Sequence, residues 1–399
     1  MSTRSFSLDG YGPRRRSAWS RLTARDSVVW QLDWIMLLAG TALSVIGSLL
    51  VYSATRNRTE LNQGDPHYFL FRHVVFLVIG VGMMAGVVWL GHRRLRSAVP
   101  VLYSVAVLLA VCVLTPLGAT INGSRAWLNL GGGFTIQPAE FIKITVILGM
   151  AMLLAEKVDA GDRDHPDHRT VVHALGMAVL PVAVIMLMPD LGSVMVLVVI
   201  VLAVLLASGA SNRWILGLGL AGAIGAVSIW ALGLLDEYQI NRFAAFANPA
   251  LDPAGVGYNT NQARIAIGSG GLTGKGLFEG TQTTGQFVPE QQTDFVFTVA
   301  GEELGFLGGA LILVLLGVVI WRACRIARES TELYSTIVAA GIIAWFAFQA
   351  FENIGMTLGI MPVAGLPLPF VSYGGTSMFA VWIAVGLLQS IRTQRPIAA

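Results

Sequence analysis

Long apolar runs alternate with short polar segments along almost the whole chain. Ten such runs lie at 33–52, 72–90, 98–117, 138–155, 171–188, 191–208, 214–234, 297–321, 335–358 and 372–390. A helix of about 20 apolar residues is long enough to cross the hydrocarbon core of a bilayer. The pattern therefore predicts an all-α fold, a polytopic membrane helix bundle with about ten transmembrane helices.

Composition supports a membrane protein. Hydrophobic residues make up 55% of the chain and charged residues 12%, with a net charge of +3, whereas soluble domains carry about 25% charged residues. These values exclude an ordinary soluble enzyme, a disordered chain and a fibrous protein. No segment outside the N-terminus is densely basic, so we expect no nucleic-acid partner. The two cysteines, Cys112 and Cys324, form neither a disulfide framework nor a metal-binding spacing.

The basic residues indicate the orientation. With the N-terminus inside, 18 of the 26 Lys and Arg residues fall in cytoplasmic segments, 7 fall outside and Lys143 lies within a span. The positive-inside rule therefore places both termini in the cytoplasm. We divide the chain into an arginine-rich cytoplasmic tail (1–32), the bundle (33–390) and a C-terminal cytoplasmic tail (391–399). The first tail either attracts anionic membrane lipid or only determines topology.

One outer segment, 235–296, is much longer than the other loops. Apolar residues recur between its polar ones, which predicts short structured helices at the membrane surface. Its glycine-rich run ends in Gly274-Lys275-Gly276, but it departs from a phosphate-binding loop because Ser269 replaces the first glycine and Gly276 follows the lysine. Two interpretations stay open. The glycine amides and Lys275 could cradle a pyrophosphate, or the run could form tight turns.

Charged residues within or beside the apolar runs are the second group of candidates, because ionisable groups in a membrane are costly and are often functional. They are Glu140 with Lys143 at helical spacing, Asp190 at a span break, Asp294 before the eighth run, Glu302 and Glu303 inside it, and Glu352 beside Asn353 in the ninth. Ion pairing that locks the bundle is the alternative for the glutamates. Asp294 has no basic neighbour in the sequence, which favours a chemical role.

Two further residues in an outer loop suggest ligand binding. Arg125 and Trp127 are spaced by two, an arrangement that suits a sugar or a pyrophosphate, although a lid packed over the bundle would look the same. The six histidines are scattered and show no HExxH or Cys/His spacing, so we expect no zinc site held by the protein.

Taken together, the motifs resemble the SEDS family, the RodA/FtsW glycosyltransferases of bacterial cell-wall synthesis. They occur in order as Gly123-Ser124-Arg125-Ala126-Trp127, Gln137-Pro138-Ala139-Glu140 with Lys143, Pro189-Asp190-Leu191-Gly192, Gly268 to Gly276, Pro289 to Asp294, and Pro362 to Phe370 with Ser372-Tyr373-Gly374-Gly375. Pro189 to Gly192, Tyr258-Asn259 with Gln262, and Gly365 to Pro369 look more like the elongation branch, RodA. Gln292 departs from the common histidine, and Ala139 and Thr376 from serine.

The resemblance implies an enzyme of the bacterial plasma membrane whose active site faces the outside. Its substrate would be lipid II, the undecaprenyl-pyrophosphate disaccharide-pentapeptide, which it would polymerise into glycan strands for cell elongation and shape. Asp294 would be the catalytic carboxylate, near Glu140 and Lys143. A class B penicillin-binding protein, which crosslinks the strands, would be the obligate partner.

As a mechanism, we expect Asp294 to act as general base on the acceptor 4-hydroxyl while undecaprenyl pyrophosphate leaves. Arg125, Arg242, Lys275 or a divalent cation (Mg or Mn) would stabilise the leaving group. Trp127 and Gln262 complete the predicted substrate-binding residues. No nucleotide is needed, because the pyrophosphate bond carries the energy. The alternatives are a lipid II flippase and a non-catalytic scaffold that recruits the penicillin-binding protein.

Overall fold

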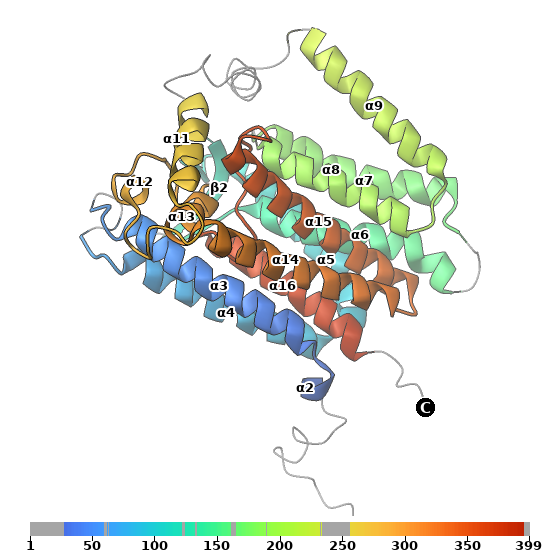
Figure 1. Ribbon diagram of the computed structural model, residues 1–399. Coiled ribbons are helices and arrows are strands. Elements are labelled where there is room, and N and C mark those ends of the chain that lie inside the picture. Colours follow the sequence, from blue (N-terminus) through green and yellow to red (C-terminus); the bar gives the residue numbers. More distant parts are fainter. Residues whose placement is uncertain are drawn as a thin grey trace, which may run out of the picture.

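The computed structural model describes residues 28–394 except 60, 61, 63, 122, 123, 132, 133, 161–164, 189, 232 and 234–255. Most of the long helices run alongside one another, whereas α9 extends away from the others and has few contacts with α8 (Figure 1). The long helices are α3 (Trp34–Thr55), α4 (Tyr68–Leu90), α5 (His92–Leu114), α6 (Pro138–Asp159), α7 (His168–Met186), α8 (Leu191–Ala207), α9 (Asn212–Ala231), α14 (Gly305–Arg328), α15 (Leu333–Leu358) and α16 (Gly375–Thr393).

The short elements lie before, between and beside these helices. They are α2 (Val28–Gln31), α11 (Val256–Ser269), α12 (Thr281–Thr284), α13 (Val296–Glu303), and the strands β1 (Gly118–Ile121), β2 (Ser124–Gly131) and β3 (Phe134–Ile136). The short helices predicted in the long outer loop are thus confirmed for its described part, 256–296. That end of the molecule, which also carries the strands, is called the loop end below.

Nine of the ten predicted apolar runs each correspond to one long helix and the eighth to two helices, and the helical membrane bundle is confirmed. Within the described ranges, seven helices are long and apolar enough to cross a membrane, and α8 is a shorter apolar helix. The number of ten crossings stays a prediction. Both ends of the described chain lie at the same end of the bundle (Figure 1), where the amide of Gln389 bonds to the backbone of Asp33.

The bundle has a central helix, α6, and a thinly covered edge, α4 and α5. In its apolar stretch α6 is 83% buried, whereas the corresponding stretches of α4 and α5 are 22% buried. The two charged side chains buried in this stretch, Glu140 and Lys143, therefore have to find partners inside the protein, because neither water nor lipid headgroups reach them.

The all-α prediction is wrong between residues 118 and 136, where the strands β1, β2 and β3 form a three-stranded antiparallel sheet in that order. Along β2, Ala126 and Leu128 are buried, whereas Arg125 and Asn129 are exposed. Side chains on a strand point alternately to opposite faces, so this half-apolar segment packs one face on the bundle. A search for continuous apolar runs does not detect that alternation.

The eighth run is also not one helix. It is divided at Leu304 into α13 and α14, so Glu302 and Glu303 lie outside the span in which they were predicted. Gly305 has a left-handed backbone with φ of +66°, and a Cβ there would lie 2.2 Å from the backbone nitrogen of Gly274. Only glycine fits this close approach, which joins residues 270–276 to the helix break.

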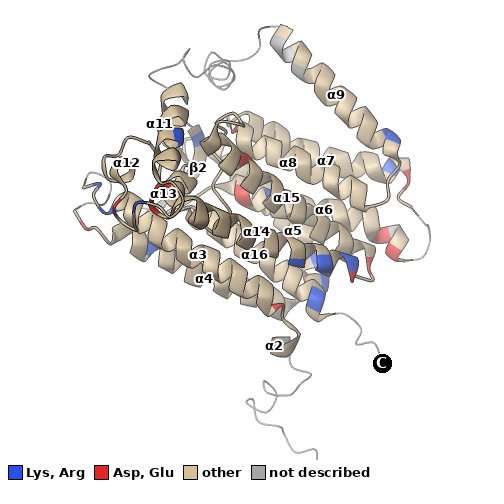
Figure 2. Ribbon diagram, viewed as in Figure 1, with Lys and Arg blue, Asp and Glu red and all other residues tan. Residues whose placement is uncertain are grey.

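Arginines gather at the end of the bundle away from the loops (Figure 2), which is called the basic end. There Asp33, at the start of α3, accepts bonds from Arg322 Nε at 2.8 Å and Nη2 at 2.6 Å and pairs with Arg392. This buried cluster joins the ends of α3, α14 and α16.

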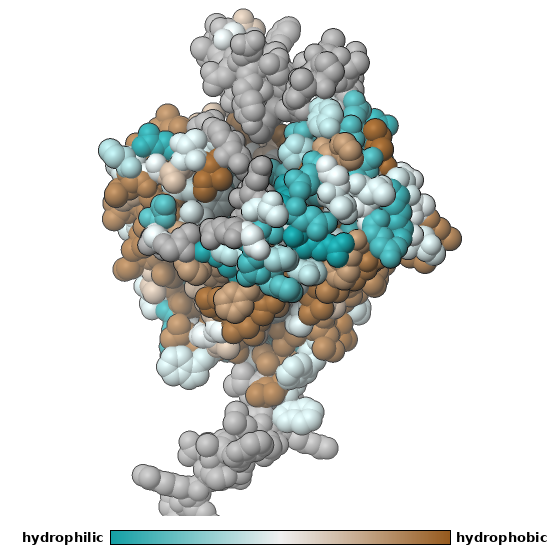
Figure 3. Space-filling view, turned by 90° about the vertical axis from the view of Figure 1, so that its left-hand side faces the viewer, coloured by the Kyte–Doolittle hydropathy of each residue, from teal (hydrophilic) through white to brown (hydrophobic). Residues whose placement is uncertain are grey.

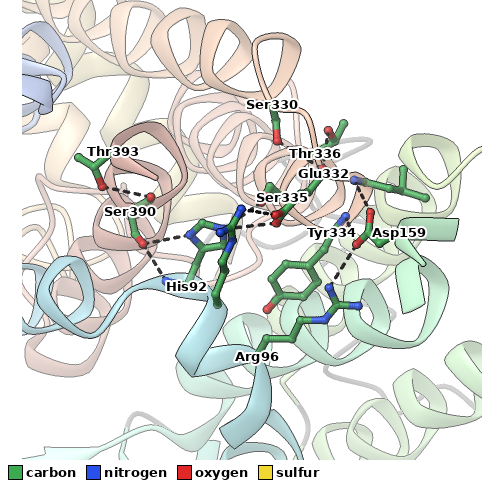
Figure 4. A network of polar contacts seen from close by, with 12 residues as sticks. His92, Arg96, Asp159, Ser330, Glu332, Tyr334, Ser335, Thr336, Ser390 and Thr393 are labelled. Atoms are coloured by element: carbon green, nitrogen blue, oxygen red, sulfur yellow. Dashed lines mark hydrogen bonds and ion pairs between the residues drawn. The ribbon is translucent and has the colours of Figure 1, made fainter. Parts of the chain in front are cut away.

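A second network ties α5, α6, α15 and α16 together at the basic end (Figure 4). The ring nitrogens of His92 lie 3.1 Å from Ser390 Oγ and 3.1 Å from Ser335 Oγ. Asp159, at the end of α6, pairs with Arg96 and accepts the backbone N–H of Leu333 at 2.8 Å. The carboxylate thereby caps the start of α15, where the first N–H groups have no partner within the helix.

Candidate active site

Asp294 lies at the loop end in residues 290–295, called the carboxylate loop, just before α13. Three consecutive carbonyls of this loop accept hydrogen bonds from the far C-terminal part of the chain. Tyr373 N donates to Gln292 O at 2.8 Å, Ser372 Oγ to Thr293 O at 2.5 Å and Asn353 Nδ2 to Asp294 O at 2.7 Å. The backbone at and before the carboxylate is therefore held in one position.

Asn353 lies on α15, whereas Ser372 and Tyr373 belong to residues 360–374, called the strap, which joins α15 to α16. Its side chains Leu366, Leu368 and Phe370 are buried and anchor it in the core. Gly365 has φ of +72°, and a Cβ there would lie 3.5 Å from Asp294 Oδ2. The half-buried carboxylate thus lies against a stretch of strap that carries no side chain.

Glu140 and Lys143 form an ion pair inside the bundle, as their spacing predicted. Lys143 Nζ donates to Glu140 Oε1 at 2.7 Å, and the two side chains are 0% and 1% exposed. The ammonium group also donates to Gln349 Oε1 at 3.0 Å and lies 4.8 Å from the ring centroid of Trp345. The pair has no net charge, and its cation has partners on both α6 and α15.

Two amides on α15 connect the ion pair and the carboxylate loop to the strap. Gln349 Nε2 donates to Pro367 O at 2.7 Å, and Asn353 Nδ2 donates to Leu366 O at 2.7 Å. The same Gln349 accepts from Lys143, and the same Asn353 donates to Asp294 O. The three residues expected to lie near one another are therefore linked through α15 and the strap.

A family model described as "Cell cycle protein", which covers FtsW, RodA and SpoVE, matches residues 33–396. That range includes the carboxylate loop, the ion pair and the strap. The chain belongs to the FtsW/RodA/SpoVE family. This confirms the resemblance read from the motifs.

The relatives of this family member include proteins named for sporulation and for peptidoglycan synthesis. It is 38% identical over 360 residues to stage V sporulation protein E of Bacillus subtilis, covering 90% of this chain and 96% of that protein. It is 33% identical over 383 residues to peptidoglycan glycosyltransferase MrdB of Escherichia coli, covering 96% and 97%. The chain also aligns with a solved structure that is described as "Structural coordination of polymerization and crosslinking by a peptidoglycan synthase complex". The TM-score is 0.75 and the sequence identity 28%, and the alignment covers 90% of this chain and 97% of that one.

The other predicted substrate-binding residues lie apart from Asp294 along the chain. Arg125 and Trp127 are on β2; Arg125 Nη2 donates to Thr115 O at 2.6 Å, and Trp127 is half-buried opposite Ala119. Gln262 is half-buried on α11, which packs against α13 and α15. Arg242 lies outside the described residues.

The glycine run forms tight turns that support the α13–α14 break. The amides of Lys275 and Gly276 donate to the carbonyls of Glu302 and Glu303 at 3.0 and 3.1 Å, and Gly274 N donates to Gly270 O at 2.9 Å. These three N–H groups already have protein acceptors and do not face an anion. The structure therefore favours tight turns over a pyrophosphate cradle as the interpretation of the run.

Lys275 is paired in the same region. Its Nζ lies 2.8 Å from Glu302 Oε1, and the Glu302 carboxylate also accepts the backbone N–H groups of Gln282 and Thr283, each at 2.8 Å. Burial raises the pKa of Glu302, but the bonds from Lys275, Gln282 and Thr283 outweigh it and leave the pKa below its ordinary value. The role of Lys275 at a pyrophosphate stays a prediction.

Three other charged residues singled out in the sequence lie among contacts within the folded chain. Asp190 caps α8 by accepting Ser193 N at 3.0 Å and also accepts from Gln137 Nε2 at 3.1 Å. Glu303 accepts from Ser53 Oγ at 2.5 Å and Phe278 N at 3.1 Å, and burial raises its pKa. Glu352 is fully buried in α15. In the part of the chain that is described, no three His, Cys, Asp or Glu side chains are grouped to hold a metal.

Sequence reasoning missed Gln349 altogether and noted Asn353 only as a neighbour of Glu352. The available signal was an amide pair at i,i+4 in an otherwise apolar run, which places both on one helix face. It also missed that Ser372 and Tyr373 hold the carboxylate loop, because nothing local in the sequence relates residues 292–294 to 372–373.

Proposed function

We propose that this chain is a peptidoglycan glycosyltransferase that polymerises lipid II into glycan strands, with Asp294 as its general base. Family membership over residues 33–396 and a relative named peptidoglycan glycosyltransferase support the reaction class. The observation that carries the choice of Asp294 is its position. It is a half-buried carboxylate on a loop whose carbonyls at 292, 293 and 294 are all held by α15 and the strap.

In this mechanism Asp294 takes the proton of the acceptor 4-hydroxyl as that oxygen attacks the anomeric carbon of the growing chain. The bond between the anomeric carbon and the pyrophosphate oxygen breaks, and undecaprenyl pyrophosphate leaves with the electron pair. Attack opposite the leaving group inverts the anomeric centre. A general base contributes about 10²- to 10⁴-fold to such reactions when it is held in position, and the fixed backbone supplies that constraint.

The substrate contacts are proposed as follows. Cations near the loop end would stabilise the departing pyrophosphate, and Arg125, Arg242 and Lys275 are the protein's candidates. A Mg or Mn ion bound with the pyrophosphate would supply further positive charge there. Trp127 and Gln262 would contact the sugars. The Glu140–Lys143 pair supports the site from inside the bundle rather than touching the substrate, since both side chains are buried.

The arrangement in the membrane follows from charge. The basic end would face the cytoplasm and the loop end the outside, with ten crossings and both termini inside. Figure 3 looks onto the loop end and shows hydrophilic residues gathered there beside hydrophobic surface. The lipid II headgroup would react on this surface while its lipid chain stays in the bilayer.

We also propose a class B penicillin-binding protein as partner and the elongation branch as the biological setting. The aligned solved structure is described as a peptidoglycan synthase complex that coordinates polymerization and crosslinking, which supports such a partner. The elongation branch is supported by the wording of the motifs at 189–192, 258–262 and 365–369 and by the similarity to MrdB.

The test is glycan synthesis from purified lipid II by the protein with its class B partner, whose transpeptidase serine is inactivated. We expect wild-type protein to make long glycans and a folded Asp294→Asn variant to lose at least about 10²-fold in rate. Equal activity of the two would remove Asp294 from the mechanism. Lipid II transfer across vesicles without polymer would identify a flippase, and partner recruitment without either activity would identify a scaffold.

A further inference from the structure

Asn353 is a buried amide whose bonds all go to the carboxylate loop and the strap. It is 0% exposed and lies four residues after Gln349 on the same face of α15. Its single amide nitrogen donates to Asp294 O and to Leu366 O, both at 2.7 Å. Its two hydrogens are therefore used on two carbonyls from segments that are far apart in sequence.

The oxygen of this amide adds no hydrogen bond that would stabilise the fold. Asn353 Oδ1 is buried without a hydrogen-bond partner among the residues that the structure describes. A buried polar atom without a partner costs about 1–3 kcal/mol. Flipping the amide would place its oxygen against two carbonyls, so the observed orientation is the only favourable one. Asn353 Oδ1 therefore costs free energy, while Nδ2 joins the backbones of Asp294 and Leu366.

We propose that Asn353 is the positioning residue for Asp294. Its NH₂ group holds the Asp294 carbonyl against the strap, and so keeps the carboxylate in the space left by Gly365. Gln349 does the same for the buried cation, because it accepts from Lys143 and donates to Pro367 O. Two side chains of α15 therefore bind adjacent residues of the strap. Asn353 links the strap to the base, and Gln349 links it to the ion pair.

This inference rests on the proposed function, since it assigns Asn353 a task only if Asp294 reacts. Its physical basis is sensitivity to position: a shift of about 1 Å at a reacting group can lower a rate about 10²-fold. Without the NH₂ group, the carbonyls of Asp294 and Leu366 would face each other across a buried gap with no donor between them. The bonds from Tyr373 and Ser372 would still join the strap to the loop at residues 292 and 293, but the loop would shift at Asp294 itself, and its carboxylate would move.

Three variants test the proposal in the polymerisation assay. Asn353→Leu removes both donors while it keeps the size of the side chain. Asn353→Asp replaces the NH₂ group by an oxygen, which repels both carbonyls when ionised and donates one bond when protonated. Gln389→Leu is the matched control, because Gln389 is also a fully buried amide with two bonds to backbone atoms, those of Asp33, at the basic end.

We expect Asn353→Leu to lower kcat by about 10- to 10²-fold with KM for lipid II changed less than about 2-fold, because the base and not the binding surface is displaced. Gln389→Leu should lower the thermal unfolding temperature to a similar extent but leave kcat near wild type. For Asn353→Asp, the ratio of its rate to the wild-type rate should rise as the pH falls from 8 to 5.5. A difference in the amount of folded protein that is the same at every pH scales this ratio by a constant and leaves its change with pH unaffected.

The outcomes separate the two proposals. If Asp294→Asn is inactive but folded Asn353→Leu keeps wild-type kcat, the positioning role is overturned and the polymerase stands. If Gln389→Leu loses kcat as much as Asn353→Leu, the effect is general destabilisation and the positioning role is again overturned. If wild type and Asp294→Asn make equal polymer, the proposed function itself fails.

Discussion

At the scale of single residues, the Glu140–Lys143 pair depends on each member being present. Both charges are removed from water, and the ammonium group is surrounded by Glu140, Gln349 and the Trp345 ring. Removal of one partner from a buried ion pair costs about 3–5 kcal/mol, because the other charge remains without compensation, whereas removal of both can be close to neutral.

We therefore expect Lys143→Met and Glu140→Gln each to lower the thermal unfolding temperature strongly, and the double variant to regain much of the loss. Unfolding monitored by tryptophan fluorescence in detergent checks this. Asp33 offers a comparison, because Asp33→Asn leaves two arginines without their carboxylate at the basic end and should also destabilise. Single variants as stable as wild type would show that water or lipid headgroups compensate the buried charge.

Residue spacing was enough to pair Glu140 with Lys143, because the geometry of a helix places i and i+3 on one face. It was not enough to find Gln349 or to relate Asp294 to Asn353. Those contacts join segments more than 50 positions apart along the chain, and no local pattern encodes which polar side chain on one helix will face another.

At the scale of elements, the break between α13 and α14 determines the electrostatics of the loop end. It releases Glu302 and Glu303 from the span into contact with the glycine run and α12. Hydropathy could not reveal this, since Glu302 and Glu303 are flanked by apolar stretches on both sides and the break depends on one left-handed glycine. The prediction of a single helix over 297–321 failed for that reason.

The two glutamates should respond to pH in opposite directions. The folded-state pKa of Glu302 is lowered from its ordinary value of 4.5, so its ionised form stabilises the folded state above that value, and the contribution is lost as the pH falls through the folded-state pKa. The folded-state pKa of Glu303 is raised, so its ionised form opposes folding above its unfolded-state pKa, and acid relieves this effect.

We thus expect Glu302→Gln to unfold at lower temperature than wild type at pH 7, with a deficit that shrinks as the pH falls below about 4.5. Glu303→Gln should show a smaller deficit at pH 7 that grows on acidification. Thermal unfolding of both variants and the wild type between pH 7 and pH 4 provides the measurement. A Glu302→Gln deficit that is constant with pH would mean that the carboxylate is not ionised in the folded protein.

At the scale of the whole molecule, the positions of the chain ends and of the charged residues distinguish one end of the bundle from the other. Both described ends lie at the basic end, whereas the carboxylate loop, the sheet and α11 lie at the loop end (Figures 1 and 2). If the basic end is cytoplasmic, exposed positions at the two ends must differ in their accessibility from outside the cell.

This topology can be tested with single cysteines in a variant that lacks Cys112 and Cys324. Asn129→Cys, on β2, should react with a membrane-impermeant thiol reagent added to intact spheroplasts, whereas Thr331→Cys, before α15, should react only after permeabilisation; both positions are exposed. Labelling of both from outside, or of Thr331→Cys alone, would refute ten crossings with cytoplasmic termini.

By itself, the sequence determined the class of the protein, the positions of its long helices and its family. These properties depend on composition, on the length of apolar runs and on short motifs, which are all local. Tertiary structure alone decided that residues 118–136 form a sheet, that the glycine run supports a helix break, and that α15 connects a buried ion pair to Asp294. Each of these is a contact between distant segments, whose free energy depends on which surfaces the folded chain brings together.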